Sequence, residues 1–295
     1  MAAILCLSPA PTATLAFLGD VMLGRGVAAA HTSGGWETAL APISTELQAA
    51  SLALANLESL LTSAPLLPVE GETGKSLPYD LRAGPQGLRT LLVAGIDLVS
   101  IANNHTYDSG PQGLADTRRS LVEAGILPVG PGGLPVYRQA GGLTLAFLAY
   151  DDINVRFGLE EAAEAVTTAR RSGALVFVSI HWGSEYVPAP NPRQQAVALT
   201  LANAGAAVIW GHHPHVRQPV KWVQGEGQSR PALVAYSLGN ALFDQTTPPA
   251  AQLGALLRVT VDREGVLSAE IIPFEIDPRS GIVVSSLAPV LLPGE

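Results

Sequence analysis

Short runs rich in valine, isoleucine and leucine alternate along the chain with longer alanine-rich stretches of helical character. This alternation is typical of βαβ units, in which a largely parallel sheet is buried on both faces. Ala-Gly pairs at 94–95, 124–125 and 204–205 suit helix ends, because glycine readily takes the left-handed conformation that follows a helix. We therefore expect an α/β fold with strands at 14–18, 52–56, 98–102, 144–149, 176–180, 207–210, 233–236, 256–261 and 268–272.

From residue 233 onward the expected strands are separated only by turns and loops, which predicts antiparallel strands that complete a second sheet. A hydrophobic fraction of 47% with only 14% charged residues provides an ample core and excludes a disordered chain. No linker or repeat divides the sequence, so we expect residues 14–295 to form one domain. Residues 1–13 fit either a disordered start or a residual secretion signal, because their apolar stretch lacks a basic region before it.

Charge and hydropathy narrow the range of partners. The formal net charge is −8 and lysine and arginine form no block, which argues against nucleic acid or an anionic membrane surface as a partner. No stretch reaches the roughly 18 uninterrupted apolar residues of a membrane span, so we expect no integral membrane segment. The single Cys6 excludes an internal disulfide and leaves the redox compartment open.

Polar residues of metal-binding types follow nearly every expected strand, and five of the six histidines stand at such strand ends. The carboxyl ends of parallel strands meet at one edge of a sheet, where open α/β folds place their ligands. Neutral imidazole is the commonest side-chain metal ligand. The sequence therefore predicts one metal site assembled from distant stretches, with candidates Asp20, Asn56, Glu58, Asn104, His105, Asp151, Asp152, His181, His213, His215 and Asn240.

Most of these candidates have a structural alternative. Asp20 after a glycine also suits a turn or a helix cap, and His181 alone also suits a core histidine bound to backbone. Glu58 follows an apolar run, and a buried carboxylate needs a partner or a metal. The pair His213 and His215 flanks a proline that holds it extended. His212 is expected to face away, since adjacent side chains point in opposite directions on extended backbone.

The donor types indicate which ions would bind. A mixture of carboxylates, an asparagine oxygen and imidazoles suits Mn²⁺, Fe or Zn²⁺ better than Ca²⁺, which takes oxygen ligands. More than four candidate ligands predict two divalent ions, about 3.5–4 Å apart and bridged by a carboxylate such as Glu58. Such a centre is typical of hydrolases.

Six segments together resemble the CapA family of bacterial capsule and poly-γ-glutamate synthesis proteins, within the calcineurin-like metallophosphoesterase superfamily. The resemblance extends over roughly residues 14–272. It implies a four-layer α/β/β/α sandwich of two mixed sheets with a two-metal site at one sheet edge. The segments, in chain order, are FLGDVMLGR at 17–25, NLE at 56–58, ANNHTYDSG at 102–110, HWG at 181–183, GHHPHV at 211–216 and SLGNALFD at 237–244.

The resemblance implies a role for each matching residue. Asp20 and His215 would bind one metal, Glu58 would bridge both, and the second metal would take Asn104, His181 and His213. His105 would protonate the leaving group or orient the substrate, supported by Asp108. Arg25 is a candidate anion clamp, with a surface salt bridge as the equal alternative, and Asn240 is a candidate substrate-binding residue.

The first two motifs depart from the wider superfamily. Met22 stands where the superfamily motif Asp-x-His has its histidine, and Glu58 stands where aspartate is usual. The missing imidazole is expected to leave one metal under-coordinated, so that this metal binds loosely, prefers a harder ion or keeps an open position for substrate.

Three functions are consistent with these features. The first is a binuclear hydrolase of capsule or poly-γ-glutamate processing, in which metal-bound hydroxide attacks an amide or ester of an anionic polymer. The second is a phosphoesterase, and the third is a non-catalytic metal-dependent accessory protein that binds a polyanion within the capsule-synthesis machinery. The His105–Asp108 pair favours an enzyme, because a binder needs no proton donor. From the resemblance we expect an extracytoplasmic location.

Overall fold

The computed structural model describes residues 10–31, 35–71, 74–76, 79–277, 281–283 and 288–293. Residues 1–9 of the expected N-terminal segment therefore lie outside the described residues. Within the described residues, strands build two large sheets and a small hairpin of β3 (Val69–Gly71) and β4 (Gly74–Ser76).

The first sheet is mixed. Its parallel part contains β1, β2, β5 and β6, while β14 pairs with β1 and β15 with β14 in antiparallel register. Short strands β13 and β17 attach to β1 and β15. The order is β16 (Gly281–Val283), β15 (Val266–Asp277), β14 (Leu253–Val261), β1 (Ala13–Val21), β2 (Leu52–Leu57), β5 (Leu98–Ser100) and β6 (Leu127–Val129), with β13 (Asn240–Leu242) and β17 (Val290–Leu292) off this path.

The second sheet has a parallel centre and antiparallel edges. Strands β12, β10, β9 and β8 run parallel to one another, and β11 and β7 pair with its two ends in antiparallel register. The order is β11 (Val220–Val223), β12 (Ala232–Ala235), β10 (Ala206–His212), β9 (Leu175–His181), β8 (Leu143–Asp151) and β7 (Val136–Ala140).

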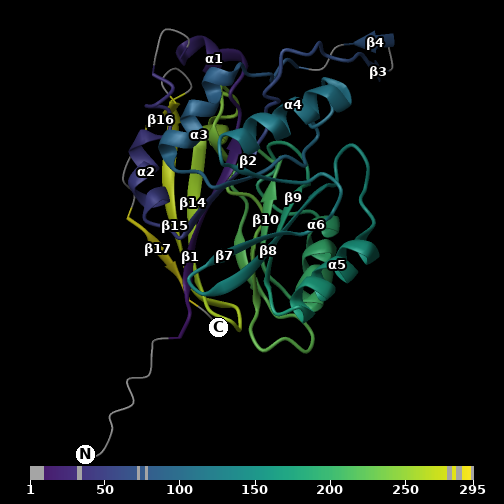
Figure 1. Cartoon of the computed structure of the whole chain (residues 1–295), viewed down its shortest axis with the longest axis vertical. Coiled ribbons are helices and arrows are strands. Elements are labelled where there is room, and N and C mark those ends of the chain that lie inside the picture. Colours follow the sequence, from purple (N-terminus) through teal and green to yellow (C-terminus); the bar gives the residue numbers. More distant parts are fainter. Residues whose placement is uncertain are drawn as a thin grey trace, which may run out of the picture.

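Helices cover the outer faces of the two sheets, so the molecule has the four layers α/β/β/α that the resemblance implies (Figure 1). The second sheet is covered by α5 (Leu159–Arg171) and α6 (Pro192–Ala204). The first sheet packs against α1 (Arg25–His31), α2 (Ala41–Gln48), α3 (Leu88–Ala94) and α4 (Gly110–Glu123). None of the described helices is both long and apolar enough to cross a membrane.

Continuous apolar strands follow from this layering. In β1, Leu15 and Phe17 point into the core between the sheets, whereas Ala16 and Leu18 face the helices of the first sheet. Strand β8 does the same, with Phe147 between the sheets. Because both faces are buried, each central strand is a nearly continuous apolar run.

All the strands expected from the sequence are present, but their assignment to sheets needs one correction. Strands β14 and β15 are antiparallel, as expected, yet they extend the first sheet beyond β1 instead of completing the second one. Strand β12 does lie in the second sheet, where it is antiparallel to β11, as expected, but parallel to β10. Local sequence predicts that a segment is extended, but its partner depends on long-range packing.

The helix ends follow their sequence signals. Helix α3 ends at Gly95 with φ 81°, and α6 ends at Gly205 with φ 101°, both in the left-handed conformation. At the start of α6, the Asn191 side chain accepts a hydrogen bond from the Gln194 amide, and Gln194 reciprocates in a capping box.

Candidate metal centre

The carboxyl ends of strands from both sheets come together at one place. Asp20 of β1 pairs in register with Asn56 of β2 and with Asn240 of β13. In the second sheet, His181 of β9 pairs with His212 of β10. A hydrogen bond of 3.3 Å from the His213 amide to Asp20 Oδ2 joins the two sheets at this point. The parallel arrangement thus brings together residues up to 220 positions apart in sequence, from Asp20 to Asn240.

Glu58 is the centre of the cluster. Its side chain is fully buried, and neither carboxylate oxygen has a hydrogen-bond partner among the described residues. Oε1 lies 3.7 Å from His215 Nε2, 3.8 Å from His105 Nε2 and 3.9 Å from His181 Nε2. These distances are too long for hydrogen bonds. They are the separations expected of ligand atoms that surround a shared ion.

Asp20 forms a second cluster beside it. Asn56 Nδ2 donates to Asp20 Oδ1 at 2.8 Å, and His215 Nδ1 lies 3.5 Å from Oδ2. Ligand atoms of Asp20, Glu58 and His181 all lie within 4.8 Å of one another, so these three side chains could hold a metal ion.

The expectation that His212 faces away is wrong. Its imidazole is buried, and Nδ1 lies 3.1 Å from Asp20 Oδ1. The alternation of extended backbone fails here because His213 has φ 92° and His215 has φ 56°. Two left-handed residues turn the chain sharply after β10, so all three histidines face one region.

Several buried polar atoms of the centre have no hydrogen-bond partner among the described residues. They include both ring nitrogens of His181, Nδ1 of His213 and Oδ1 of Asn104. Buried polar atoms are normally paired, and each unpaired one costs about 1–3 kcal/mol. Together with the Glu58 oxygens, they form a set of carboxylate, amide and imidazole donors that fits divalent transition metals. The residues present therefore fit the implied group.

The pKa shifts in the cluster have clear causes. Burial, together with the nearby charge of Asp20, raises the pKa of Glu58 well above its usual value. Burial and the other imidazoles lower the pKa of His181 well below its usual value, and those same causes lower the pKa of His213 to about 4. Burial opposes ionisation of Asp20, but His212, His215 and Asn56 outweigh it and lower the Asp20 pKa. The lowered pKa values keep the imidazoles of His181 and His213 neutral, as metal ligation requires, whereas the raised pKa of Glu58 means that its ionised form needs a nearby cation.

His105 and Asp108 form a pair at the edge of the centre. Nδ1 of His105 lies 2.7 Å from Oδ2 of Asp108, while its Nε2 is directed toward Glu58 and Asn104. Thr106 fixes the loop that carries the pair, because its hydroxyl lies 2.7 Å from the carbonyl oxygens of both Ile101 and Asn103 and can donate to either. A carboxylate on Nδ1 orients the ring and leaves Nε2 free to exchange a proton.

The two expected substrate-binding residues are engaged within the protein. Arg25 forms an ion pair with Asp244, with 2.9 Å between Nη2 and Oδ1, so the structure has the salt bridge that was the alternative. Asn240 Oδ1 lies 2.9 Å from His215 Nδ1, and its Nδ2 donates to Gln245 and to the Ala251 carbonyl. Asn240 therefore orients an imidazole of the centre.

Met22 belongs to the core. It is fully buried against the helices of the first sheet, and its sulfur accepts a 3.0 Å hydrogen bond from the Gly24 amide.

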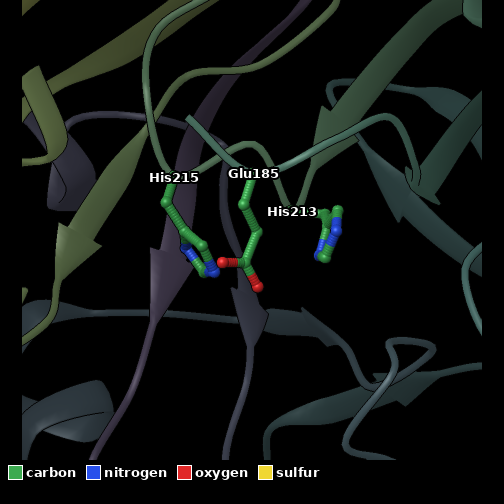
Figure 2. Close-up of side chains that lie close together, drawn as sticks. All are labelled: Glu185, His213 and His215. Carbon is green, nitrogen blue, oxygen red and sulfur yellow. The ribbon is translucent and has the colours of Figure 1, made fainter. Parts of the chain in front are cut away.

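The sequence interpretation missed Glu185. This residue follows β9 in an exposed loop, and its carboxylate offers a ligand atom within 4.8 Å of those of His213 and His215. Figure 2 shows the Glu185 carboxylate between the two imidazoles. Its position four residues after His181 was the available signal, because loops that leave strand ends also supply ligands.

Sequence comparisons find similar proteins among known bacterial proteins. The chain is 28% identical to the capsule biosynthesis protein CapA of Bacillus anthracis, over 92% of this chain and 70% of that protein. It is 26% identical to the PGA biosynthesis protein CapA of Bacillus subtilis, over 88% of this chain and 70% of that protein. A probable polyglutamine synthesis accessory protein of Mycobacterium tuberculosis is 28% identical over 71% of this chain and 59% of its own length.

The fold also has a counterpart among solved structures. A hypothetical protein from Thermus thermophilus superposes with a TM-score of 0.56 at 17% identity, covering 89% of this chain and 99% of that one. At family level, residues 14–245 match the bacterial capsule synthesis protein family PGA_cap, the grouping that the six motifs predicted. The chain belongs to the PGA_cap family of bacterial capsule synthesis proteins.

Proposed function

We propose that this protein is a hydrolase with two divalent metal ions that cleaves an amide or ester bond of an anionic polymer during capsule or poly-γ-glutamate processing. The observation that carries the proposal is the environment of Glu58, a fully buried carboxylate without a hydrogen-bond partner in the described structure and with three imidazole nitrogens 3.7–3.9 Å from one oxygen. A buried carboxylate in this state is costly unless cations compensate it.

We assign the donors to two ions as the family resemblance implies. Asp20 and His215 would hold the first ion, and Asn104, His181 and His213 the second, with Glu58 between them. The mixed oxygen and nitrogen donors favour Mn²⁺, Fe or Zn²⁺. Such ions would polarise the scissile group and lower the pKa of a water molecule.

The protein's own residues would complete the reaction. His105 would give a proton from Nε2 to the leaving nitrogen or oxygen, while Asp108 holds the opposite ring nitrogen at 2.7 Å. Asn240 would keep His215 in its orientation through the 2.9 Å contact to Nδ1. This arrangement supports hydrolysis over simple binding, since a proton donor fixed at the edge of the centre has no role in holding a polymer.

The relatives supply the biological setting. The two Bacillus relatives are named for capsule and PGA biosynthesis, and we extend that setting to this chain. The mycobacterial relative is named an accessory protein, which makes a non-catalytic polyanion-binding role the second candidate. A phosphoesterase would use the same centre on a phosphate ester.

One experiment separates these functions. Protein purified without chelator is analysed for metal and then assayed with Mn²⁺, Fe²⁺ or Zn²⁺ on poly-γ-glutamate, aryl esters and aryl phosphates. Shortening of the polymer, abolished by His105→Ala, supports the proposal, whereas turnover of the phosphate alone indicates a phosphoesterase. Less than one ion per chain after metal addition would overturn the two-metal proposal, and two bound ions without any turnover would favour the accessory role.

A further inference from the structure

A cavity of about 400 Å³ lies beside the candidate metal centre, on the His105 side. Its walls come from the loop after β5, the loop after β8, the glycine-rich turn at 131–133 and the first turn of α5. The volume is typical of sites that take a small ligand group. No role described so far uses this cavity.

Three lining residues of the cavity are close in sequence or structure to residues of the metal centre. Tyr107, on its rim, stands between His105 and Asp108 in sequence. Asp151, in its wall, pairs in register with His181 across strands β8 and β9. The Asn154 side chain, also in the wall, donates a 2.7 Å hydrogen bond to the Asn104 carbonyl. The cavity therefore adjoins the centre on the side of the loop that carries His105.

The lining is aromatic and apolar. The rings of Tyr150 and Phe157 stack with centroids 4.7 Å apart, and the side chain of Tyr107 is 53% exposed at the rim. The Tyr150 hydroxyl is buried and has no hydrogen-bond partner among the described residues. Ala162 of α5 adds a small apolar side chain. Such walls favour a flat apolar ligand that stacks on the rings.

The charged side chains that line the cavity are all acidic. Asp151 and Glu161 line the cavity, and the described lining residues include no lysine or arginine. Arg193 lies 5.8 Å from the centroid of the Phe157 ring but is bound by both oxygens of Asp152, and Arg118 donates to the Gly130 carbonyl. Arg156 is exposed and stands between Val155 and Phe157 in sequence, but it is not among the lining residues. A carboxylate in the cavity would therefore meet two carboxylates of the lining and no lining cation.

We propose that this cavity binds the leaving group of the hydrolysed bond, and that this group is an apolar, uncharged or cationic alcohol or amine, preferably with an aromatic ring. The assignment of the cavity to the leaving group rests on the proposed hydrolytic function, whereas the ligand preference rests on the cavity alone. A γ-glutamyl unit as the leaving group carries a free carboxylate and does not fit, so cleavage between two γ-glutamyl units would support the proposed function but overturn the leaving-group role of this cavity. The anionic part of the substrate then lies on the other side of the scissile bond.

The step balances without a further reactant. Water adds its oxygen and one hydrogen to the acid fragment, and the bond to the leaving oxygen or nitrogen breaks. His105 gives that atom a proton and recovers one from the same water. The products are an acid and a neutral alcohol or an amine, and the alcohol or amine occupies the cavity before release.

The test measures binding of small probes to the full chain by calorimetry or ligand-observed NMR, both with chelator and with Mn²⁺. We expect benzylamine to bind about tenfold or more tightly than benzoate, since like charge disfavours the acid. Ala162→Leu fills the cavity and should abolish benzylamine binding, and Phe157→Ala should weaken it by removing the stacked ring. Leu199→Ala, on the exposed face of α6, should change nothing.

The outcomes distinguish this proposal from the proposed function. Three results would overturn the ligand preference, whether or not the protein is a hydrolase. Benzoate and benzylamine bind equally well, benzylamine does not bind at all, or benzylamine still binds to both Ala162→Leu and Phe157→Ala variants that are folded. If benzoate binds only with Mn²⁺ and Ala162→Leu does not change that binding, benzoate occupies the metal centre. This result does not contradict the ligand preference of the cavity. If the probes bind as expected but no ester is hydrolysed, the hydrolytic function fails, and with it the leaving-group role, while the cavity's ligand preference stands.

Discussion

Nε2 of His215 lies 3.7 Å from Oε1 of Glu58, and neither atom donates or accepts a hydrogen bond across this gap. Two ligand atoms that each lie about 2.0–2.2 Å from one ion at a tetrahedral angle are roughly 3.3–3.6 Å apart. The observed separation is close to that value. Asn240, 2.9 Å from the other nitrogen of the same ring, holds the imidazole in this orientation.

Replacing Glu58 by glutamine should abolish the proposed metal binding and stabilise the metal-free protein. The carboxylate is buried without a partner in the described structure, so without metal its charge opposes folding. We expect a gain on the order of 1–3 kcal/mol in the free energy of unfolding with chelator present. Metal analysis and urea denaturation check both effects, with Glu164→Gln on α5 as the control. Full metal content together with unchanged stability would contradict the role assigned to Glu58.

His105→Ala should lower the hydrolytic rate while the protein keeps its metal. A positioned general acid contributes roughly 10²–10⁴-fold in rate. Asp108→Asn should cause a smaller loss, since it only weakens the orientation of the His105 ring across the 2.7 Å contact. Rates on a common substrate and metal content are measured for both variants. Loss of metal in His105→Ala would instead make His105 a ligand.

The sequence predicted the elements that depend on local pattern. Strands β1, β2, β8, β9 and β10 are buried on both faces, which favours apolar residues along most of their length, with polar residues mainly at their carboxyl ends, and makes them recognisable. Their parallel arrangement then places the residues after them at one edge, so Asp20, Glu58 and His181 could be grouped without coordinates.

Features that depend on backbone conformation or long-range packing could not be predicted in this way. The orientation of His212 follows from the positive φ of His213, which no rule for extended chains anticipates. Strand β7 was missed because it is largely exposed and polar at the sheet edge. Glu185 lies in an exposed loop whose path toward His213 and His215 is set by the fold.

Without metal, the protein should lose stability in acid because of His213. Burial and the imidazole of His215 lower its pKa from 6.5 to about 4 in the folded state. Below pH 6.5 the His213 imidazole therefore binds a proton in the unfolded chain but not in the folded chain, so stability falls as pH decreases toward 4. A shift of this size corresponds to about 3 kcal/mol.

The comparison of wild type with His213→Gln isolates this effect. The pKa of Glu58 is raised, so Glu58 acts in the opposite direction: its contribution is lost as pH rises above its ordinary value of 4.5. Both proteins share that contribution, and it cancels to first order in the difference. Urea denaturation between pH 4 and 7 with chelator should show a shallower acid loss in the variant. Parallel curves would contradict the assignment.

Glu185→Gln should weaken metal binding, because Glu185 brings a third carboxylate to the centre from the exposed side, beside His213 and His215. The superfamily motif has a histidine where this chain has Met22, and the Glu185 carboxylate would supply a ligand in place of that imidazole. We expect the Mn²⁺ affinity to fall by about 10-fold or more, as for supporting groups of metal sites. Calorimetric titration of chelator-treated protein measures this affinity, with Glu164→Gln as the matched exposed control.

A second variant, Glu185→Asp, separates two causes of such a loss. Its shorter side chain keeps the charge but withdraws the oxygens. Wild-type affinity in Glu185→Asp would indicate a long-range field, whereas a loss close to that of Glu185→Gln indicates direct coordination. Unchanged affinity in both variants would exclude Glu185 from the centre.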